Sequence, residues 1–197
     1  VDTPAASRHT SGDLFLRSRK DGPIAWFARA SLYDERRNNG TQLQTNDAAL
    51  RSASGGIDEV IGRIKLSFRA DLSDELLHQS FTSIAASRAS ENLTRLQRVP
   101  ARSTGASGDI ATSVGRQAFF AGADVRWVAG KSDETGFTPS GVVPISTGGH
   151  QPLFGAHAED VVALTPDLTA SVGVRYDLWR NFDAQKVTPG GVLPFQD

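Results

Sequence analysis

The sequence predicts an all-β protein, an antiparallel up-and-down meander of about eight long strands. In segment 168–178 every second residue is apolar, and each residue between is small or polar. This period of two means that one strand face contacts an apolar medium and the other contacts water or charges. Strands in soluble domains usually have about 5–6 residues, whereas a tilted strand of roughly 9–11 residues crosses a bilayer. The pattern therefore indicates part of an outer-membrane β-barrel, or a small complete one.

The composition agrees with this fold class. The 197 residues are 39% hydrophobic, which is low for a globular domain but ordinary for a barrel with a polar interior. No stretch approaches the roughly 20 apolar residues of a membrane helix. The net charge of −1 gives no field that attracts nucleic acid, and the absence of cysteine excludes disulfides and thiolate metal sites.

Eight strands are expected within one segment, 1–197. They lie near residues 13–19, 23–36, 57–70, 75–90, 99–114, 117–130, 152–164 and 168–180. The first strand ends at a strong turn signal, Lys20-Asp-Gly-Pro23. The second and third alternate clearly, with Trp26 on the apolar face of the second and Leu66 on that of the third.

The middle of the chain is less regular. Asp71-Leu-Ser-Asp74 predicts a short turn into strand 75–90. That strand does not alternate strictly, so residues 74–79 could instead begin a helix. The polar segment 91–98 then leads to the poorly patterned strand 99–114.

Later strands are again regular and are joined by short turns. Gly115-Arg116 precedes strand 117–130, and Thr165-Pro-Asp167 joins the last two strands as a tight hairpin. The stretches rich in Gly, Asn, Ser and Thr are expected to be long loops: 37–56, 131–151 and 181–197. Short and long connections thus alternate, as do the periplasmic turns and extracellular loops of outer-membrane barrels.

Several segments resemble a known family. Phe154-Gly-Ala-His-Ala-Glu-Asp160, Leu164-Thr-Pro-Asp-Leu-Thr169 and Val172-Gly-Val-Arg-Tyr-Asp177 resemble a barrel hairpin of TonB-dependent outer-membrane receptors. Ala121-Gly-Ala-Asp-Val-Arg126 with Gly130-Lys-Ser-Asp-Glu134, and Arg36-Arg-Asn-Asn-Gly-Thr41, are similar to further units of these barrels. The resemblance covers roughly residues 24–182.

This resemblance implies uptake of a scarce nutrient such as a siderophore, cobalamin or a glycan. The long loops would capture the ligand, and TonB would then drive a rearrangement of the plug. Neither a plug nor a TonB-contacting box is recognisable. The barrels of this family close with about 22 strands, which is more than 197 residues can supply. The implied object is a section of a receptor barrel in the bacterial outer membrane. Its partners would be outer-membrane lipid and, at its open sheet edges, either the remaining strands and plug of a parent receptor or another chain. TonB would be contacted only through the missing part.

Charged and aromatic residues provide candidate sites. Eight charges at positions opposite the apolar ones are expected to face the lumen: Arg29, Arg63, Lys65, Arg69, Asp124, Arg126, Arg175 and Asp177. Cross-strand pairs that hold register explain them better than a substrate path does. Rings near strand ends predict an aromatic girdle at the membrane interface, formed by Trp26, Trp127, Tyr176 and Trp179. Asp160 falls on the apolar face of its strand unless a β-bulge turns it away.

Polar residues of the expected loops are candidates for ligand contact, although loop polarity alone predicts the same set: Arg37, Asn38, Asn39, Lys131, Asp133 and Glu134. Neighbouring acidic residues on a strand point to opposite faces, so they form no catalytic pair. The four histidines show no metal-ligand spacing, and no nucleotide or nucleophile motif occurs. We therefore expect no enzymatic activity, cofactor, metal or nucleic-acid partner. Two alternatives are a non-catalytic structural β-sheet subunit that pairs with or packs on a larger complex, and a complete small eight-stranded barrel.

Overall fold

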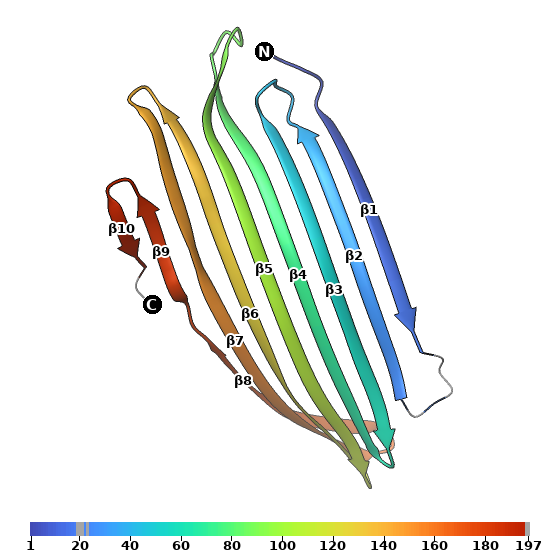
Figure 1. The fold of residues 1–197 in the computed structure, drawn as a ribbon. Coiled ribbons are helices and arrows are strands. Elements are labelled where there is room, and N and C mark those ends of the chain that lie inside the picture. Colours follow the sequence, from blue (N-terminus) through green and yellow to red (C-terminus); the bar gives the residue numbers. More distant parts are fainter. Residues whose placement is uncertain (19–21, 23, 196–197) are drawn as a thin grey trace.

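Ten antiparallel strands form one continuous sheet in the computed structural model, which describes residues 1–18, 22 and 24–195 (Figure 1). The strands are β1 (Ala6–Arg17), β2 (Ile24–Asn38), β3 (Thr45–Ile61), β4 (Ile64–Ile84), β5 (Glu91–Val114), β6 (Gln117–Thr138), β7 (Gly141–Thr165), β8 (Leu168–Trp179), β9 (Phe182–Thr188) and β10 (Gly191–Pro194). From β1 to β7 each strand pairs with the next one in the sequence. The predicted all-β antiparallel meander is therefore confirmed.

The structure has two strands more than predicted, because β9 and β10 follow β8, and β8 and β9 share one edge of β7. β8 pairs with the half of β7 that begins at Leu153, and β9 pairs with the half between Ser146 and His150. The register shifts by one residue within the β9 pairing, next to Asp183, whose φ is 52°. β9 therefore continues β8 beyond a β-bulge. β10 pairs only with β9.

Strands replace most of the predicted long loops. β3 begins at Thr45, inside the expected loop 37–56, and β6 and β7 together fill most of 131–151. The expected loop 181–197 contains β9 and β10. Apolar residues in these stretches do not recur at every second position, so no alternation identified them as strands.

The predicted turn at 71–74 and the possible helix at 74–79 both lie inside the single strand β4. The chain instead turns at Gly62-Arg63, which divides the predicted strand 57–70 between β3 and β4. The polar segment 91–98 belongs to β5. Gly22 apart, the predicted turn at 20–23 lies outside the described residues.

Tight turns close one end of the sheet. Gly62 and Gly115 each have a φ of 62° at the first position of a two-residue connection, the position that a type II′ turn reserves for glycine. A further tight turn at this end lies at Pro166-Asp167. At the opposite end the connections are residues 39–44 and 85–90 and the short turns 139–140 and 189–190. We call these the turn end and the loop end.

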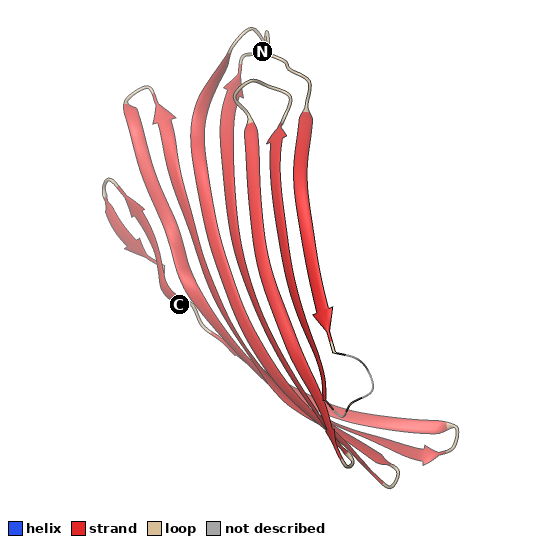
Figure 2. Cartoon of the chain, turned by 45° about the vertical axis from the view of Figure 1, so that its right-hand side comes forward, coloured by secondary structure: helices blue, strands red, loops and turns tan. Residues whose placement is uncertain are grey.

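The sheet is a single curved layer with two open edges (Figure 2). Within the described residues, no apolar side chain is buried and β1 does not pair with β8. No helix in this part of the chain is long and apolar enough to span a membrane.

Candidate functional site

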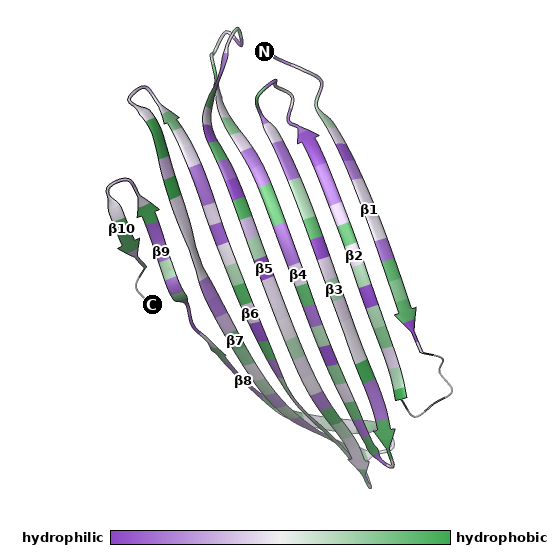
Figure 3. Ribbon diagram, in the orientation of Figure 1, coloured by the Kyte–Doolittle hydropathy of each residue, from purple (hydrophilic) through white to green (hydrophobic). Residues whose placement is uncertain are grey.

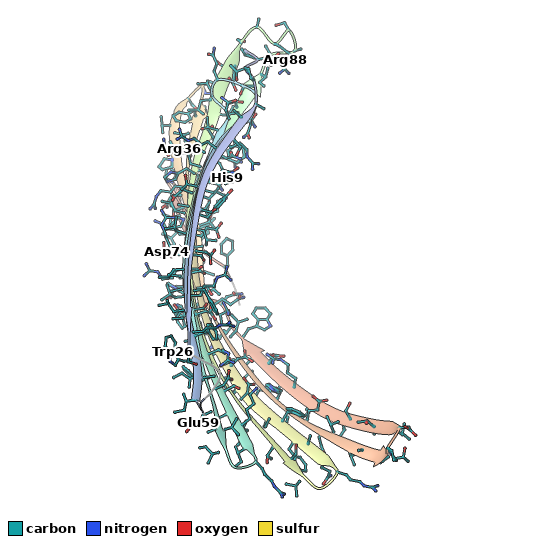
Figure 4. The ribbon with its side chains drawn as sticks, turned by 90° about the vertical axis from the view of Figure 1, so that its right-hand side faces the viewer. His9, Trp26, Arg36, Glu59, Asp74 and Arg88 are labelled. Atoms are coloured by element: carbon teal, nitrogen blue, oxygen red, sulfur yellow. The ribbon has the colours of Figure 1, made fainter. Side chains whose placement is uncertain are left out.

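The strand register assigns each side chain to one of two faces. Directly paired residues of neighbouring strands point to the same side, so one row across the sheet defines a face: Trp26, Ile57, Phe68, Gly108, Ala123, Ala156 and Tyr176. Figure 4 shows Trp26, Arg36 and Asp74 on the convex side of the sheet and His9 on the concave side. We call the face of Trp26 the convex face and the other the concave face.

The convex face carries a continuous apolar belt near the turn end. Its large side chains are all more than one-third exposed: Leu14, Leu16, Trp26, Leu32, Ile57, Leu66, Phe68, Leu72, Ile110, Phe119, Val125, Trp127, Phe154, Val172, Val174, Tyr176 and Leu178. On β6 the belt runs from Phe119 to Trp127, about 27 Å along the strand at about 3.4 Å per residue. At a strand tilt of about 40° this corresponds to a height of about 21 Å, close to the apolar band of roughly 25 Å on transmembrane barrels.

Charged side chains replace apolar ones above the belt, toward the loop end. On the convex face Arg51 binds Asp34 at 2.9 Å and Arg102 binds Asp74 at 2.6 Å. β2 changes in the same direction, from hydrophobic near the turn end to hydrophilic near the loop end (Figure 3). Beyond the belt, the strands therefore continue toward the loop end as a segment whose charged convex side chains form ion pairs and favour water.

Asp160 lies near the lower limit of the belt. The register of β7 is continuous through Asp160, which pairs with Phe119 and Val172 on the convex face. The bulge proposed for this position occurs instead between Ala163 and Thr165. Gln117 Nε2 donates to Asp160 Oδ2 at 3.0 Å, so the carboxylate has a polar partner at the turn end.

The concave face carries a ladder of ion pairs across the sheet. Arg29 binds Asp13 at 2.7 Å, and Arg69 binds Asp58 at 2.8 Å. The ladder continues with Arg126–Asp71 at 3.0 Å, Arg175–Asp124 at 3.0 Å and Arg175–Asp177 at 2.7 Å. Lys65 lies on the same face, opposite Val60 and Ala111 in the register. Of the predicted lumen charges only Arg63 is misplaced, because it lies in the turn between β3 and β4.

Glycines make room for this ladder. A Cβ atom on Gly155 would lie 2.3 Å from Arg175 Nη2 and 2.6 Å from Asp124 Oδ1. A Cβ on Gly105 would lie 2.8 Å from Asp71 Oδ1 and 3.0 Å from an Arg126 nitrogen. The sequence does not reveal this role of the glycines, because it depends on which residues lie opposite each other across strands.

Three of the four predicted girdle aromatics share the convex face. Trp26 and Tyr176 belong to one row, and Trp127 lies at the upper limit of the belt. Trp179 pairs with Leu153 and lies on the concave face. Tyr176 and Trp179 are three residues apart on one strand, so they must point to opposite faces, and the assignment of Trp179 to a lipid-facing girdle was wrong.

The six predicted ligand residues lie at the loop end but do not converge. Arg37 binds Glu35 at 2.7 Å, and the side-chain amide of Asn38 donates to the Thr41 carbonyl at 2.9 Å. Asn39 follows on the connection after β2. On β6, Lys131 and Asp133 form a 2.8 Å pair on the convex face, whereas Glu134 points to the concave face and binds Arg95 at 3.1 Å. Four strand spacings separate the two groups, about 19 Å at about 4.8 Å each.

Polar contacts that the sequence did not reveal fix the loop end. The carboxylate of Glu91 accepts hydrogen bonds from Thr41 Oγ1 and, at 3.0 Å, from the Leu43 amide. Arg88 in the β4–β5 connection donates to Asp2 and lowers the pKa of that carboxyl below its ordinary value. Connection 39–44 is therefore held by neighbouring elements, and no sequence motif marks these contacts.

The described residues show no catalytic or metal-binding arrangement. In that part of the chain no three His, Cys, Asp or Glu side chains come together as metal ligands. The acidic residues are distributed along an extended sheet, and half of those that the structure describes are bound to arginines.

Comparison with known proteins shows the fold. No family model and no curated protein matches the sequence. The ferric yersiniabactin uptake receptor FyuA from Yersinia pestis matches over 95% of this chain and 32% of its own, with a TM-score of 0.74 and 13% identity. The ferric citrate transporter FecA in its unliganded form matches over 93% of this chain and 32% of its own, with a TM-score of 0.51 and 11% identity.

By their names, the first neighbour is an uptake receptor for ferric yersiniabactin and the second is a transporter of ferric citrate. The chain spans about one third of each neighbour's length. At these identities the likeness concerns the fold: a curved, antiparallel sheet of the kind found in the walls of outer-membrane barrels.

Proposed function

We propose that this chain is a section of the barrel wall of a TonB-dependent outer-membrane receptor that takes up a scarce nutrient. The observation that carries the proposal is the two-faced sheet, with an exposed apolar belt on its convex face and an ion-pair ladder on its concave face. In a barrel the convex face would contact lipid and the concave face would line a polar interior. The structural likeness to two uptake receptors supports the same assignment.

The parent receptor would lie in the bacterial outer membrane with its loop end outward. Short turns lie toward the periplasm in such barrels, and the longer strands and loops extend outside the cell. Ligand contact would then involve the loop end, with Arg37, Asn38, Asn39, Lys131, Asp133 and Glu134 as candidates. A siderophore, cobalamin and a glycan are each compatible with these polar side chains.

The open edges define the partners of this section. β1 and the β8–β10 side would each pair with further strands of the barrel, because unpaired backbone groups cannot face hydrocarbon. The concave ladder would face a plug, through which TonB would act. No catalytic step belongs to this function.

Spin labels on consecutive residues of β6 test the proposal. The chain contains no cysteine, so each residue from 119 to 127 can be replaced singly by cysteine, beginning with Val125→Cys and Arg126→Cys. In lipid vesicles we expect dissolved oxygen to reach the odd-numbered positions and a water-soluble nickel complex to reach the even-numbered ones. Labels at 131–134, above the belt, should be accessible to nickel on both faces.

The alternatives give different accessibility patterns. A structural sheet that packs on another protein would protect the odd-numbered positions from both oxygen and nickel. A sheet exposed to water would admit nickel at every position. Either pattern would contradict a lipid-facing wall. A complete eight-stranded barrel would keep the alternation but would also bring labels on β1 and β8 close together, which double labelling measures.

A further inference from the structure

Two arginines lie side by side on the convex face of the sheet without a bound carboxylate from the described part of the chain. Arg8 on β1 and Arg36 on β2 are directly opposite each other in the register. Both side chains are exposed, and neither forms an ion pair with any residue that the structure describes. Most other strand arginines bind a carboxylate: Arg29, Arg37, Arg51, Arg69, Arg95, Arg102, Arg126 and Arg175.

The acidic side chains nearby balance only one of these two charges. The nearest acidic side chain in the same row is Asp47, opposite Arg36, and the residue beyond it is His78. Asp34, two residues along β2, is bound through both oxygens by Arg51 at 2.9 Å. Like charges directly opposite in a sheet are destabilising, so an anion between the two guanidinium groups would replace repulsion with two attractive contacts.

The position of the pair identifies the kind of anion. Leu32 is the last belt residue of β2, and Arg36 lies four residues beyond it toward the loop end. This is about 13 Å along the strand, or about 10 Å in height at a tilt of about 40°. The headgroup layer of a leaflet extends about 5–8 Å beyond the hydrocarbon. Flexible arginine side chains bend toward such a layer, so they reach the headgroups from above.

We infer that Arg8 and Arg36 form a binding site for the phosphate group of an anionic lipid in the leaflet that surrounds the loop-end half of the sheet. The inference rests on the proposed function, because it requires that the belt is embedded in a bilayer. The acyl chains of the lipid would lie along the belt between Leu14 and Leu32, directly below the two arginines. The guanidinium groups would bind the phosphate oxygens with charge-assisted hydrogen bonds.

The test uses the full-length protein that contains this chain, reconstituted in nanodiscs. The variant combines Arg8→Gln and Arg36→Gln. Lys186→Gln is the matched control, because Lys186 pairs with Thr147 on the concave face within one residue of the row of Arg36. Each protein is placed in phosphatidylcholine alone and in phosphatidylcholine with added phosphatidylglycerol. Retained lipid is counted by native mass spectrometry, and thermal unfolding is recorded in parallel.

We expect wild type and Lys186→Gln to retain phosphatidylglycerol and to unfold at a higher temperature in its presence. The double variant should bind it about 30-fold more weakly, because a basic side chain near a membrane contributes about 1 kcal/mol and 1.4 kcal/mol is a tenfold change. Equal binding by the double variant would overturn the inference, as would equal weakening by Lys186→Gln. Stabilisation by inorganic phosphate in place of the lipid would also overturn it.

Two results separate this inference from the proposed function. If the double variant is destabilised equally with and without phosphatidylglycerol, the arginines bind an acidic group of a neighbouring strand, and the lipid site is wrong although the barrel remains. If the wild type does not enter nanodiscs and the spin labels show no alternation, the proposed function itself fails.

Discussion

Replacement of Gly155 by alanine tests whether the concave ladder holds the strands together. The new Cβ atom would lie 2.3 Å from Arg175 Nη2, 2.6 Å from Asp124 Oδ1 and 2.9 Å from Asp177 Oδ1. Arg175 must therefore move away from both of its carboxylate partners, which it now contacts at 3.0 and 2.7 Å. Exposed ion pairs contribute about 0.2–1 kcal/mol each, so the loss of two should destabilise the fold by about 0.5–2 kcal/mol.

Gly108→Ala is the control for this substitution. Gly108 lies on the convex face of β5, where an added Cβ would meet nothing within 4 Å. Both substitutions reduce the entropy of the unfolded chain equally, so the difference between them isolates the effect on the ladder. Urea unfolding of the full-length protein in detergent micelles, followed by intrinsic tryptophan fluorescence, measures that difference.

A double-mutant cycle makes the test sharper. In an Arg175→Gln background the ion pairs are already absent and the crowding guanidinium is gone, so Gly155→Ala should cost less than in the wild type. An identical cost in both backgrounds would refute the reasoning. So would equal free energies of unfolding for the Gly155→Ala and Gly108→Ala proteins.

Three further predictions concern the belt, a turn and the loop end. Ala123→Arg, at the middle of the belt on β6, should destabilise the inserted fold by about 2–4 kcal/mol, whereas Val128→Arg on the concave face should cost far less; equal costs in vesicle-based unfolding would contradict the assignment of faces. Gly62→Val should cost about 1–2 kcal/mol, because Gly62 has a φ of 62° and the space around it is empty; a urea midpoint equal to that of the wild type would exclude this backbone strain. The lowered pKa of Asp2 means that its contact with Arg88 is fully present above the ordinary carboxyl value of 3.8 and is lost as the pH falls through the lowered pKa; hydrogen exchange of residues 2–5 should accelerate in that range, and Asp2→Asn should remove the dependence.

The belt could be predicted from the sequence because it is regular at the level of single residues. On β8 the alternation of Val172, Val174 and Tyr176 with small or charged residues continues without interruption. A strand with one face in lipid and one in water must alternate in this way. The same alternation placed seven of the eight predicted ladder charges on a common face. The predicted position of Arg63 was wrong because its neighbour Gly62 introduces a turn, which cannot be recognised from the alternation.

The loop-end half of the sheet could not be predicted in the same way. Both faces of β3 near Thr45 and of β7 near Gly148 contact water or polar partners, so neither apolar spacing nor hydropathy marks them. Gly55 and Gly56 looked like loop residues, yet both lie within β3, and Gly56 leaves space for Arg69 and Phe27. What makes these segments strands is backbone pairing with neighbours far along the chain, and pairing of this kind has no local signature.

The sequence by itself determined the all-β class, the period of the strands, the apolar belt and the charged face opposite it. These features follow from the medium that each residue contacts, and a medium selects residue types one position at a time. The tertiary structure decided where strands end above the belt, that β9 continues β8, that Trp179 faces the concave side, and that Arg8 and Arg36 lie opposite each other. These features depend on register, which relates residues on different strands. Register is set jointly by turns, bulges and cross-strand contacts, so no single stretch of sequence contains it.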